Sequence, residues 1–262
     1  MKVATLLYHD VVESGRLDES GFPGPGPGRY KLDLDDFEHH LETLERLVGT
    51  APAAADDLEG GRSAIPWLLT FDDGGSSAGR IGELLATRGW RGHFFVTVDY
   101  IGKPGFVDES AIRSLRDLGH IVGSHSCSHP ERMSRCTWDE LMYEWSRSTE
   151  VLSELLGEAV DVASVPAGHY ARVVAEAAAA SGIRTLFTSE PVLSVRDVEG
   201  CRVFGRYTIQ RGVPAERAAA LANSRTSPRA RQFVFWNTKK LAKKVGGERY
   251  LRLRERLLAA RS

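Results

Sequence analysis

The chain has 262 residues, enough for one large domain or two small ones with a core that needs no disulfide support. Apolar residues make up 42% and charged residues 26%, which excludes a disordered chain, and three scattered cysteines exclude a disulfide framework. No apolar run approaches the ~18 residues of a membrane-spanning helix. The first apolar run ends at His9, too early for a secretory leader. We therefore expect a cytoplasmic protein.

The net charge of −1 hides a basic C-terminus. From Arg225 onward the chain carries 12 Lys and Arg residues against only Glu248 and Glu255. Such a segment is either a solvated helix surface on an acidic body or a peripheral contact with an anionic inner membrane surface. It lacks a nucleic-acid reading motif, so we expect no nucleic-acid partner. The sequence does not indicate an oligomeric state.

Short apolar runs alternate with segments of helical periodicity. The runs lie at 3–8, 66–71, 93–98, 120–124, 161–165, 184–188 and 203–209. This alternation predicts an α/β fold of parallel strands joined by crossover helices. Seven strands in series indicate a closed or nearly closed (β/α) barrel, with an open doubly wound sheet as the alternative. In both folds the chemistry belongs at the carboxyl ends of the strands.

The intervening segments carry helix signals. Apolar residues share one face over 36–48, and an Ala-rich helix is expected at 173–180 before Gly182. Thr137 and Glu140 have the spacing of a capping box, which predicts a helix from there to about Leu156.

Two segments depart from this alternation. Residues 21–28 (GFPGPGPG) predict a loop after the first strand, either bordering the site or lying on the surface. We expect a barrel over 1–212 and a basic helical C-terminal extension over 213–262. The aromatic residues within 232–236 are expected to dock this extension on the barrel.

Two polar clusters follow predicted strands. Asp72 and Asp73 come directly after the strand at 66–71, where two adjacent carboxylates repel each other and lose solvation. His125 and His129 are four residues apart just past another strand. Two imidazoles and one carboxylate form a three-ligand set that leaves a metal position open, as in catalytic Zn²⁺ sites.

TFDDG at 70–74 and HSCSH at 125–129 resemble the first two motifs of the polysaccharide deacetylases of carbohydrate esterase family 4, the NodB-homology domain. The resemblance spans roughly residues 3–210 and implies a distorted (β/α) barrel. It implies that Asp72 is the general base and that Asp73, His125 and His129 bind a divalent metal ion, with Zn²⁺ expected.

The third family motif is altered. The family has an arginine that orients the base where this chain has Ser164, two residues before Pro166. Arg206, at the end of the last predicted strand, is a candidate to supply that charge; the alternative is an ordinary structural ion pair. The resemblance further implies that Pro166, Gly168, His169 and Tyr170 line the sugar pocket.

The late histidine of the fifth motif is missing, because no histidine follows His169. The first strand, however, ends Leu7-Tyr8-His9-Asp10, which has the form of that motif. First and last strands are neighbours in a closed barrel, so a strand moved to the N-terminus keeps its place. This arrangement resembles the exopolysaccharide branch of the family, and we predict that His9 is the general acid.

These features predict a metal-dependent hydrolase that removes N-acetyl groups from N-acetylhexosamine units of a polysaccharide, oligosaccharide or lipid-linked precursor. An O-acetyl esterase or small-molecule amidase would use the same groups. A carbohydrate-binding accessory protein is the third alternative, favoured by the altered third motif and opposed by Asp72, since a binder needs no general base.

Overall fold

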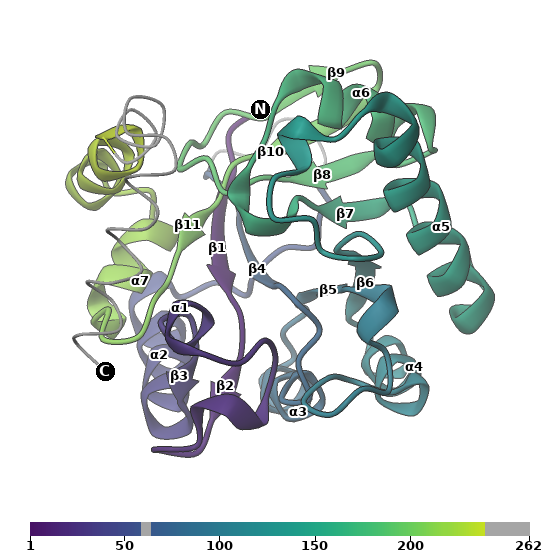
Figure 1. The fold of residues 1–262 in the computed structure, drawn as a ribbon. Coiled ribbons are helices and arrows are strands. Elements are labelled where there is room, and N and C mark those ends of the chain that lie inside the picture. The colour runs from purple at the N-terminus through teal and green to yellow at the C-terminus, as the bar shows by residue number, and fades with distance from the viewer. Residues whose placement is uncertain (59–63, 239–262) are drawn as a thin grey trace.

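Eight short strands form a curled parallel sheet in the computed structural model, which describes residues 1–58 and 64–238 (Figure 1). In chain order they are β1 (Ala4–Tyr8), β4 (Trp67–Phe71), β5 (His93–Val96), β6 (Ile121–Ser124), β7 (Val162–Ser164), β8 (Thr185–Phe187), β10 (Cys201–Phe204) and β11 (Tyr207–Thr208). The order in the sheet is β11-β1-β4-β5-β6-β7-β8-β10, and β9 (Arg196–Val198) adds an antiparallel edge to β10.

The last predicted strand is broken, and its two halves pair with opposite ends of the curled sheet, which in the described part of the chain is not closed by a strand pair between them. β10 pairs with β8, whereas β11, two residues further along, pairs with β1. The predicted strand at 203–209 is therefore two strands separated by Gly205 and Arg206. A Cβ at Gly205 would lie 2.4 Å from the carbonyl oxygen of Glu190, so the bend requires glycine. The result is the distorted barrel that we predicted.

Helices cover the outside of the barrel (Figure 1). They are α1 (Pro25–Gly28), α2 (Leu34–Val48), α3 (Ala78–Ala86), α4 (Glu109–Asp117), α5 (Trp138–Leu156), α6 (Arg172–Ala180) and α7 (Ala215–Ala222). Short 3₁₀ turns occur at η1 (Leu17–Glu19), η2 (Val98–Tyr100), η3 (Met133–Arg135) and η4 (Pro166–Gly168). The capping box between Thr137 and Glu140 starts α5 as predicted.

The segment 21–28 differs from the prediction. Its first half is a loop, but Pro25–Gly28 forms the single helical turn α1, with proline at the first position. Proline is suited to that position because its fixed φ is already helical and its missing N–H would have no partner there. The two-residue strands β2 (Val11–Val12) and β3 (Leu32–Asp33) pair with each other. This pair holds together the two ends of the loop that contains α1.

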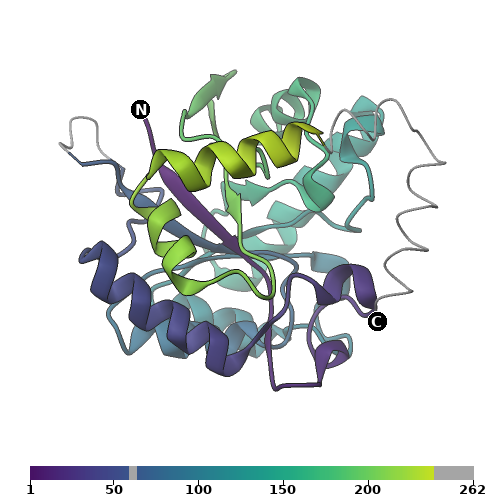
Figure 2. The same ribbon diagram turned by 90° about the vertical axis from the view of Figure 1, so that its left-hand side faces the viewer.

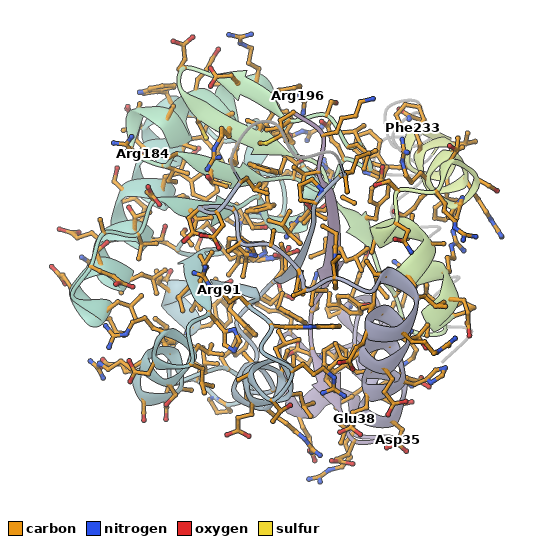
Figure 3. The ribbon with its side chains drawn as sticks, turned by 180° about the vertical axis from the view of Figure 1, so that it is seen from behind. Asp35, Glu38, Arg91, Arg184, Arg196 and Phe233 are labelled. Carbon is orange, nitrogen blue, oxygen red and sulfur yellow. The ribbon has the colours of Figure 1, made fainter. Side chains whose placement is uncertain are left out.

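Charged side chains line the outside and aromatic rings fill the inside. Asp35 and Glu38 lie on the outer face of α2 (Figure 3), while Phe37 on the same helix is fully buried. Inside the barrel, the rings of Phe95 and Phe187 lie with their centroids 5.4 Å apart. This apolar interior has a low dielectric, so a charge placed there needs a counter-charge.

Through α7, the described part of the predicted C-terminal extension packs beside β1 and α2 (Figure 2). After α7 a second helix begins at residue 226 and continues to 238, the last described residue. Arg229 donates a hydrogen bond to the Tyr207 hydroxyl (3.0 Å) and Gln232 to the Thr208 carbonyl (2.8 Å). The prediction of aromatic docking is wrong for Phe233, which stays 47% exposed (Figure 3).

Most of the basic residues of this extension lie in 239–262, outside the described residues, so the membrane contact stays a prediction. Across 1–58 and 64–238, no helix combines the length and hydropathy needed to cross a bilayer.

His93, at the start of β5, predicts a loss of stability in acid. Its Nε2 accepts the Ala55 N–H and its Nδ1 therefore carries the proton donated to the Leu69 carbonyl. Burial lowers the pKa of His93 from 6.5 to about 4. Below pH 6.5 the His93 side chain binds a proton in the unfolded chain, whereas in the folded protein it stays neutral. The free energy of unfolding therefore falls as the pH falls.

We expect the free energy of unfolding to fall by about 2 kcal/mol from pH 7.5 to pH 5 because of His93. Urea unfolding of wild type and His93→Gln at both pH values measures it, because glutamine keeps a neutral donor and acceptor. An equal pH dependence in the two proteins would contradict the assignment.

Candidate active site

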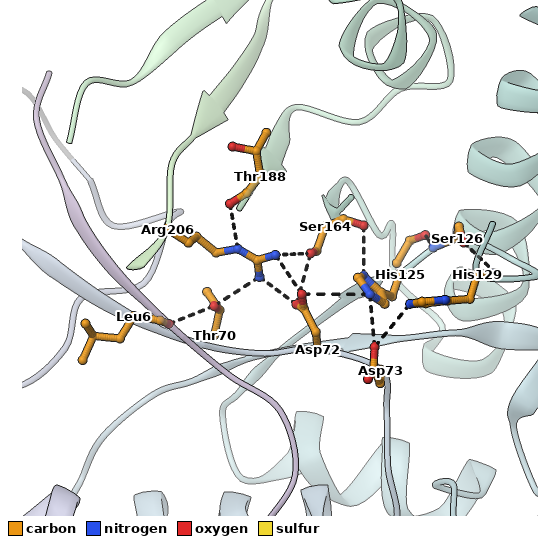
Figure 4. Close-up of polar contacts among 11 residues, drawn as sticks. Leu6, Thr70, Asp72, Asp73, His125, Ser126, His129, Ser164, Thr188 and Arg206 are labelled. Atoms are coloured by element: carbon orange, nitrogen blue, oxygen red, sulfur yellow. Dashed lines mark hydrogen bonds and ion pairs between the residues drawn. The ribbon is translucent and has the colours of Figure 1, made fainter. Parts of the chain in front are cut away.

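Polar side chains from different strands meet at one end of the barrel (Figure 4). Asp72 and Asp73 follow β4, His125 follows β6, and Ser164 ends β7. Arg206 enters from the break between β10 and β11. Parallel neighbours end at the same edge of a sheet, which explains how residues more than 130 positions apart become neighbours.

Asp73, His125 and His129 form a cluster of potential metal ligands. The Asp73 Oδ1 lies 3.3 Å from His125 Nε2 and 3.5 Å from His129 Nε2. One ligand atom from each residue falls within 4.8 Å of the others. The His125 Nδ1 donates to the Ser164 carbonyl at 3.0 Å, which leaves Nε2 free as a ligand. Two imidazole nitrogens and a carboxylate oxygen fit Zn²⁺.

The backbone at these ligands is held in an unfavourable conformation. Asp73, Ser126 and His129 all have positive φ angles, of 78°, 65° and 58°. Non-glycine residues adopt this region rarely and at an energetic cost. The Ser126 hydroxyl accepts the His129 N–H at 3.1 Å, so the turn between the two histidines is braced from within.

Glu144 braces the same turn from outside. This buried residue of α5 accepts the N–H groups of Cys127 (2.8 Å) and Ser128 (3.0 Å) on Oε2, and the Ser128 hydroxyl (2.6 Å) on Oε1. Burial, together with the charges of Glu144 and Asp99, raises the pKa of the Cys127 thiol to about 12. The thiol between the two histidines is therefore protonated in the metal-free protein, and the cluster of potential ligands does not include it.

We expect Glu144→Gln to weaken Zn²⁺ affinity by about 10- to 100-fold, because an amide cannot accept all three hydrogen bonds and the histidines lose their alignment. Competition with a chelator measures the affinity. Glu140→Gln, on the exposed side of the same helix, is the control and should bind Zn²⁺ as wild type does. Equal affinities in both variants would contradict a role for Glu144 in positioning the ligands.

Asp72 forms a buried bidentate ion pair with Arg206. The two guanidinium NH groups each lie 2.7 Å from a carboxylate oxygen of Asp72, and one also donates to the Ser164 hydroxyl at 2.7 Å. Arg206 Nε donates to the Thr188 carbonyl at 3.0 Å, and the guanidinium lies 5.8 Å from the centroid of the Phe95 ring. Arg206 is fully buried, and Asp72 is its counter-charge.

These contacts keep both carboxylates ionised. Burial alone would raise the pKa of Asp72, but the charge of Arg206 and then that of His125 outweigh it and lower the pKa. Burial likewise opposes ionisation of Asp73, whose pKa is held well below its usual value by hydrogen bonds from His125 and His129. Asp72 therefore has the unprotonated form that a general base requires.

His9 directly follows β1, whose last residue, Tyr8, pairs with Phe71 at the end of β4. The His9 ring is half-buried and lies 4.7 Å from the ring of Tyr30, centroid to centroid. Its Nδ1 is buried and has no hydrogen-bond partner among the described residues. The structure thus places His9 at the same end of the barrel as the two carboxylates.

The segment after β7 adopts a strained turn. Ala167 has φ 53° and Gly168 φ 67°. The His169 carbonyl accepts the Ser134 N–H at 3.1 Å, and the Arg196 guanidinium lies 5.3 Å from the Tyr170 ring centroid. These contacts attach the turn to η3 and β9. A role in binding sugar for Pro166, Gly168, His169 and Tyr170 stays a prediction.

A sequence profile of the family named polysaccharide deacetylase matches residues 60–186. This match identifies residues 60–186 as a polysaccharide deacetylase domain. No curated protein matches it. The matched part contains Asp72, Asp73, His125, His129 and Ser164, whereas His9 and Arg206 lie on either side of it.

Solved structures show the same fold. BC0361, a polysaccharide deacetylase from Bacillus cereus, is 20% identical with a TM-score of 0.70, covering 85% of this chain and 69% of that one. IcaB from Ammonifex degensii is 22% identical with a TM-score of 0.65, covering 85% and 97%. A de-N-acetylase from Aggregatibacter actinomycetemcomitans is 18% identical with a TM-score of 0.61, covering 82% and 96%.

The sequence analysis does not identify the roles of two residues of this candidate site. Ser164 was read only as the loss of an arginine, yet its hydroxyl contacts both Asp72 and Arg206, and its carbonyl orients His125. Glu144 is one of several polar residues of the predicted helix after Thr137, and the sequence analysis does not single it out. The only sequence signal for its role is that this carboxylate lies on the apolar face of the helix, together with Leu141 and Trp145.

Proposed function

We propose that this protein is a metal-dependent N-deacetylase acting on N-acetylhexosamine units of a polysaccharide, an oligosaccharide or a lipid-linked precursor. The observation that supports it best is an ionised, buried Asp72 next to a cluster of two histidines and one carboxylate. The Asp72 Oδ2 lies 3.9 Å from His125 Nε2, so a water held at the cluster is within reach of the base. One structure of the same fold is named a de-N-acetylase.

Asp73, His125 and His129 would hold the ion, which when bound acidifies a water and polarises the acetamide carbonyl. Asp72 is placed to take a proton from a water that attacks the acetamide carbonyl carbon. Arg206 and Ser164 hold the Asp72 carboxylate in place and keep it ionised at neutral pH. His9 donates a proton to the sugar nitrogen as the C–N bond breaks, and acetate and a free amine remain.

Acetate release tests the proposal. The substrates are N-acetylglucosamine oligomers of different linkage and O-acetylated sugars, offered to Zn²⁺-loaded and to chelator-treated protein. Release from an N-acetylated substrate by the loaded protein alone would support the N-deacetylase. Release only from O-acetyl sugars would favour an esterase, and binding of oligomers without any release would favour an accessory protein.

The role of His9 predicts a dependence on the leaving group. We expect His9→Gln to lower acetate release from N-acetyl sugars by about 10²- to 10⁴-fold, the usual contribution of a general acid. Hydrolysis of 4-nitrophenyl acetate should fall much less, because 4-nitrophenolate leaves without protonation. Rates on both substrates measure the difference. Equal losses on the two substrates would contradict the assignment of His9 as the acid.

A further inference from the structure

We propose that the loop between β2 and β3 forms an aromatic rim that binds pyranose rings of the substrate chain next to the reacting acetamide. Phe22 and Tyr30 carry this rim. The proposal rests on the proposed function, since it assigns a binding surface to the same site. The loop contains the glycine- and proline-rich segment 21–28, to which neither the metal cluster nor the base gives a role.

One loop places a ring beside each of the two histidines at the edges of the site. The Phe22 ring lies 4.6 Å from the His129 ring, and the Tyr30 ring lies 4.7 Å from the His9 ring, centroid to centroid. Both aromatic side chains are half-buried, so each keeps part of its surface open to a ligand. The two rings therefore flank the place where the acetamide would react.

Two buried charged residues fix this loop in position. Lys31 is buried, and its Nζ donates to the carbonyls of Leu17 and Phe22, each at 2.7 Å. Asp10, at the end of β1, is also buried and accepts the Ser20 hydroxyl at 2.6 Å. Burying two charged side chains to hold one loop is costly, which indicates that the position of the loop matters.

Glycine lets the loop approach this anchor. Gly21 has φ 65°, and a Cβ there would lie 2.1 Å from Asp10 Oδ2, so no other residue fits. The Gly21 N–H donates to the Gly105 carbonyl at 2.7 Å, which joins the loop to the segment after β5. The loop is thus preorganised, and binding a sugar chain would not have to order it.

A second layer of rings supports Phe22 from behind. Tyr100 and Phe106, on the segment after β5, lie with their centroids 4.8 Å and 5.0 Å from that of Phe22, both edge to face. Such packing holds a ring in one orientation. Phe22 is therefore a rigid surface and not a freely rotating side chain.

The chemistry of the rim matches a hexose chain. A pyranose presents weakly positive C–H groups on its faces and hydroxyls at its edge, and the face of an aromatic ring is negative. A ring face beside the site would take the sugar face and leave the hydroxyls in water. Binding of sugar units next to the target contributes energy that positions the acetamide for reaction.

The test is binding, measured by calorimetry on Zn²⁺-loaded protein that carries Asp72→Asn to prevent turnover. The probes are a tetrasaccharide of N-acetylglucosamine and acetate alone. Phe22→Leu and Tyr30→Leu keep apolar packing but remove the flat ring. Tyr30→Phe keeps the ring, and Trp138→Leu removes an exposed ring elsewhere on the surface, where Trp138 lines a hollow together with Glu176 and Glu199.

We expect each leucine variant of the rim to weaken tetrasaccharide binding about tenfold, equivalent to ~1.4 kcal/mol, with acetate binding changed less than about twofold. Tyr30→Phe and Trp138→Leu should bind both probes as the parent does. Unchanged tetrasaccharide affinity in both rim variants would overturn the rim and leave the proposed function standing.

Acetate affinity that falls as far as tetrasaccharide affinity would also overturn the rim, because it would mean that the rings only support the metal cluster. A parent that binds acetate but no tetrasaccharide would overturn the rim as a surface for sugar chains, whereas the proposed function is decided separately by the acetate-release assay.

Discussion

Asp72→Asn is expected to lower acetate release by about 10²- to 10⁴-fold while Zn²⁺ affinity stays within a few-fold of wild type. Asparagine has nearly the same shape and still accepts a hydrogen bond from Arg206, but it cannot take a proton from the attacking water. The metal cluster does not include this residue, since its carboxylate oxygen comes from Asp73.

The neighbouring carboxylate supplies the matched control. Asp73→Asn should lose Zn²⁺ affinity and activity together, because it removes a ligand from the cluster. Acetate release and chelator competition on both variants separate the two roles. Loss of Zn²⁺ binding in Asp72→Asn to the same extent as in Asp73→Asn would show that the first carboxylate is a ligand and not the base.

The elements that the sequence predicts correctly depend mostly on signals within a few neighbouring residues. The strand at 66–71 and the helix that starts after Thr137 depend on apolar runs and a capping box within a few residues, and both are present. The strand at 203–209 depends on distant partners. Its second half bonds to β1, 200 residues earlier, and its first half to β8, so the sequence around it does not reveal the break.

In the candidate site, too, some residues can be predicted from short motifs, whereas others depend on contacts between distant parts of the chain. The ligands Asp73, His125 and His129 lie in two short motifs whose residue types indicate a metal, and the fold brings them together. The partner of Asp72 was harder to identify, because an arginine in a late strand has many ordinary roles. The contact with Arg206 depends on the bend at Gly205, which lies between a half-strand paired with β8 and a half-strand paired with β1.

Arg206→Met is expected to destabilise the protein by about 3–5 kcal/mol at pH 7, because it leaves the Asp72 carboxylate buried without its counter-charge. The pKa of Asp72 is lowered in the folded protein, so the pair stabilises the fold above the unfolded pKa of 3.8 and loses this effect as the pH falls. Urea unfolding at pH 7 therefore measures its full contribution. In an Asp72→Asn background the same substitution should cost clearly less.

Arg206→Lys tests positioning of the base apart from stability. Lysine keeps the charge but cannot contact both oxygens of Asp72, Ser164 and the Thr188 carbonyl together. Burial then raises the pKa of Asp72, so the acid limb of the pH–rate profile should move to higher pH.

The control is Arg211, which also makes a bidentate pair, with Asp33, but with both partners partly exposed. Arg211→Met should cost less than about 1 kcal/mol and leave the acid limb in place, since water screens that pair. If the Arg206 and Arg211 variants shifted the acid limb equally, Arg206 would be a structural ion pair of the barrel and not the group that orients the base.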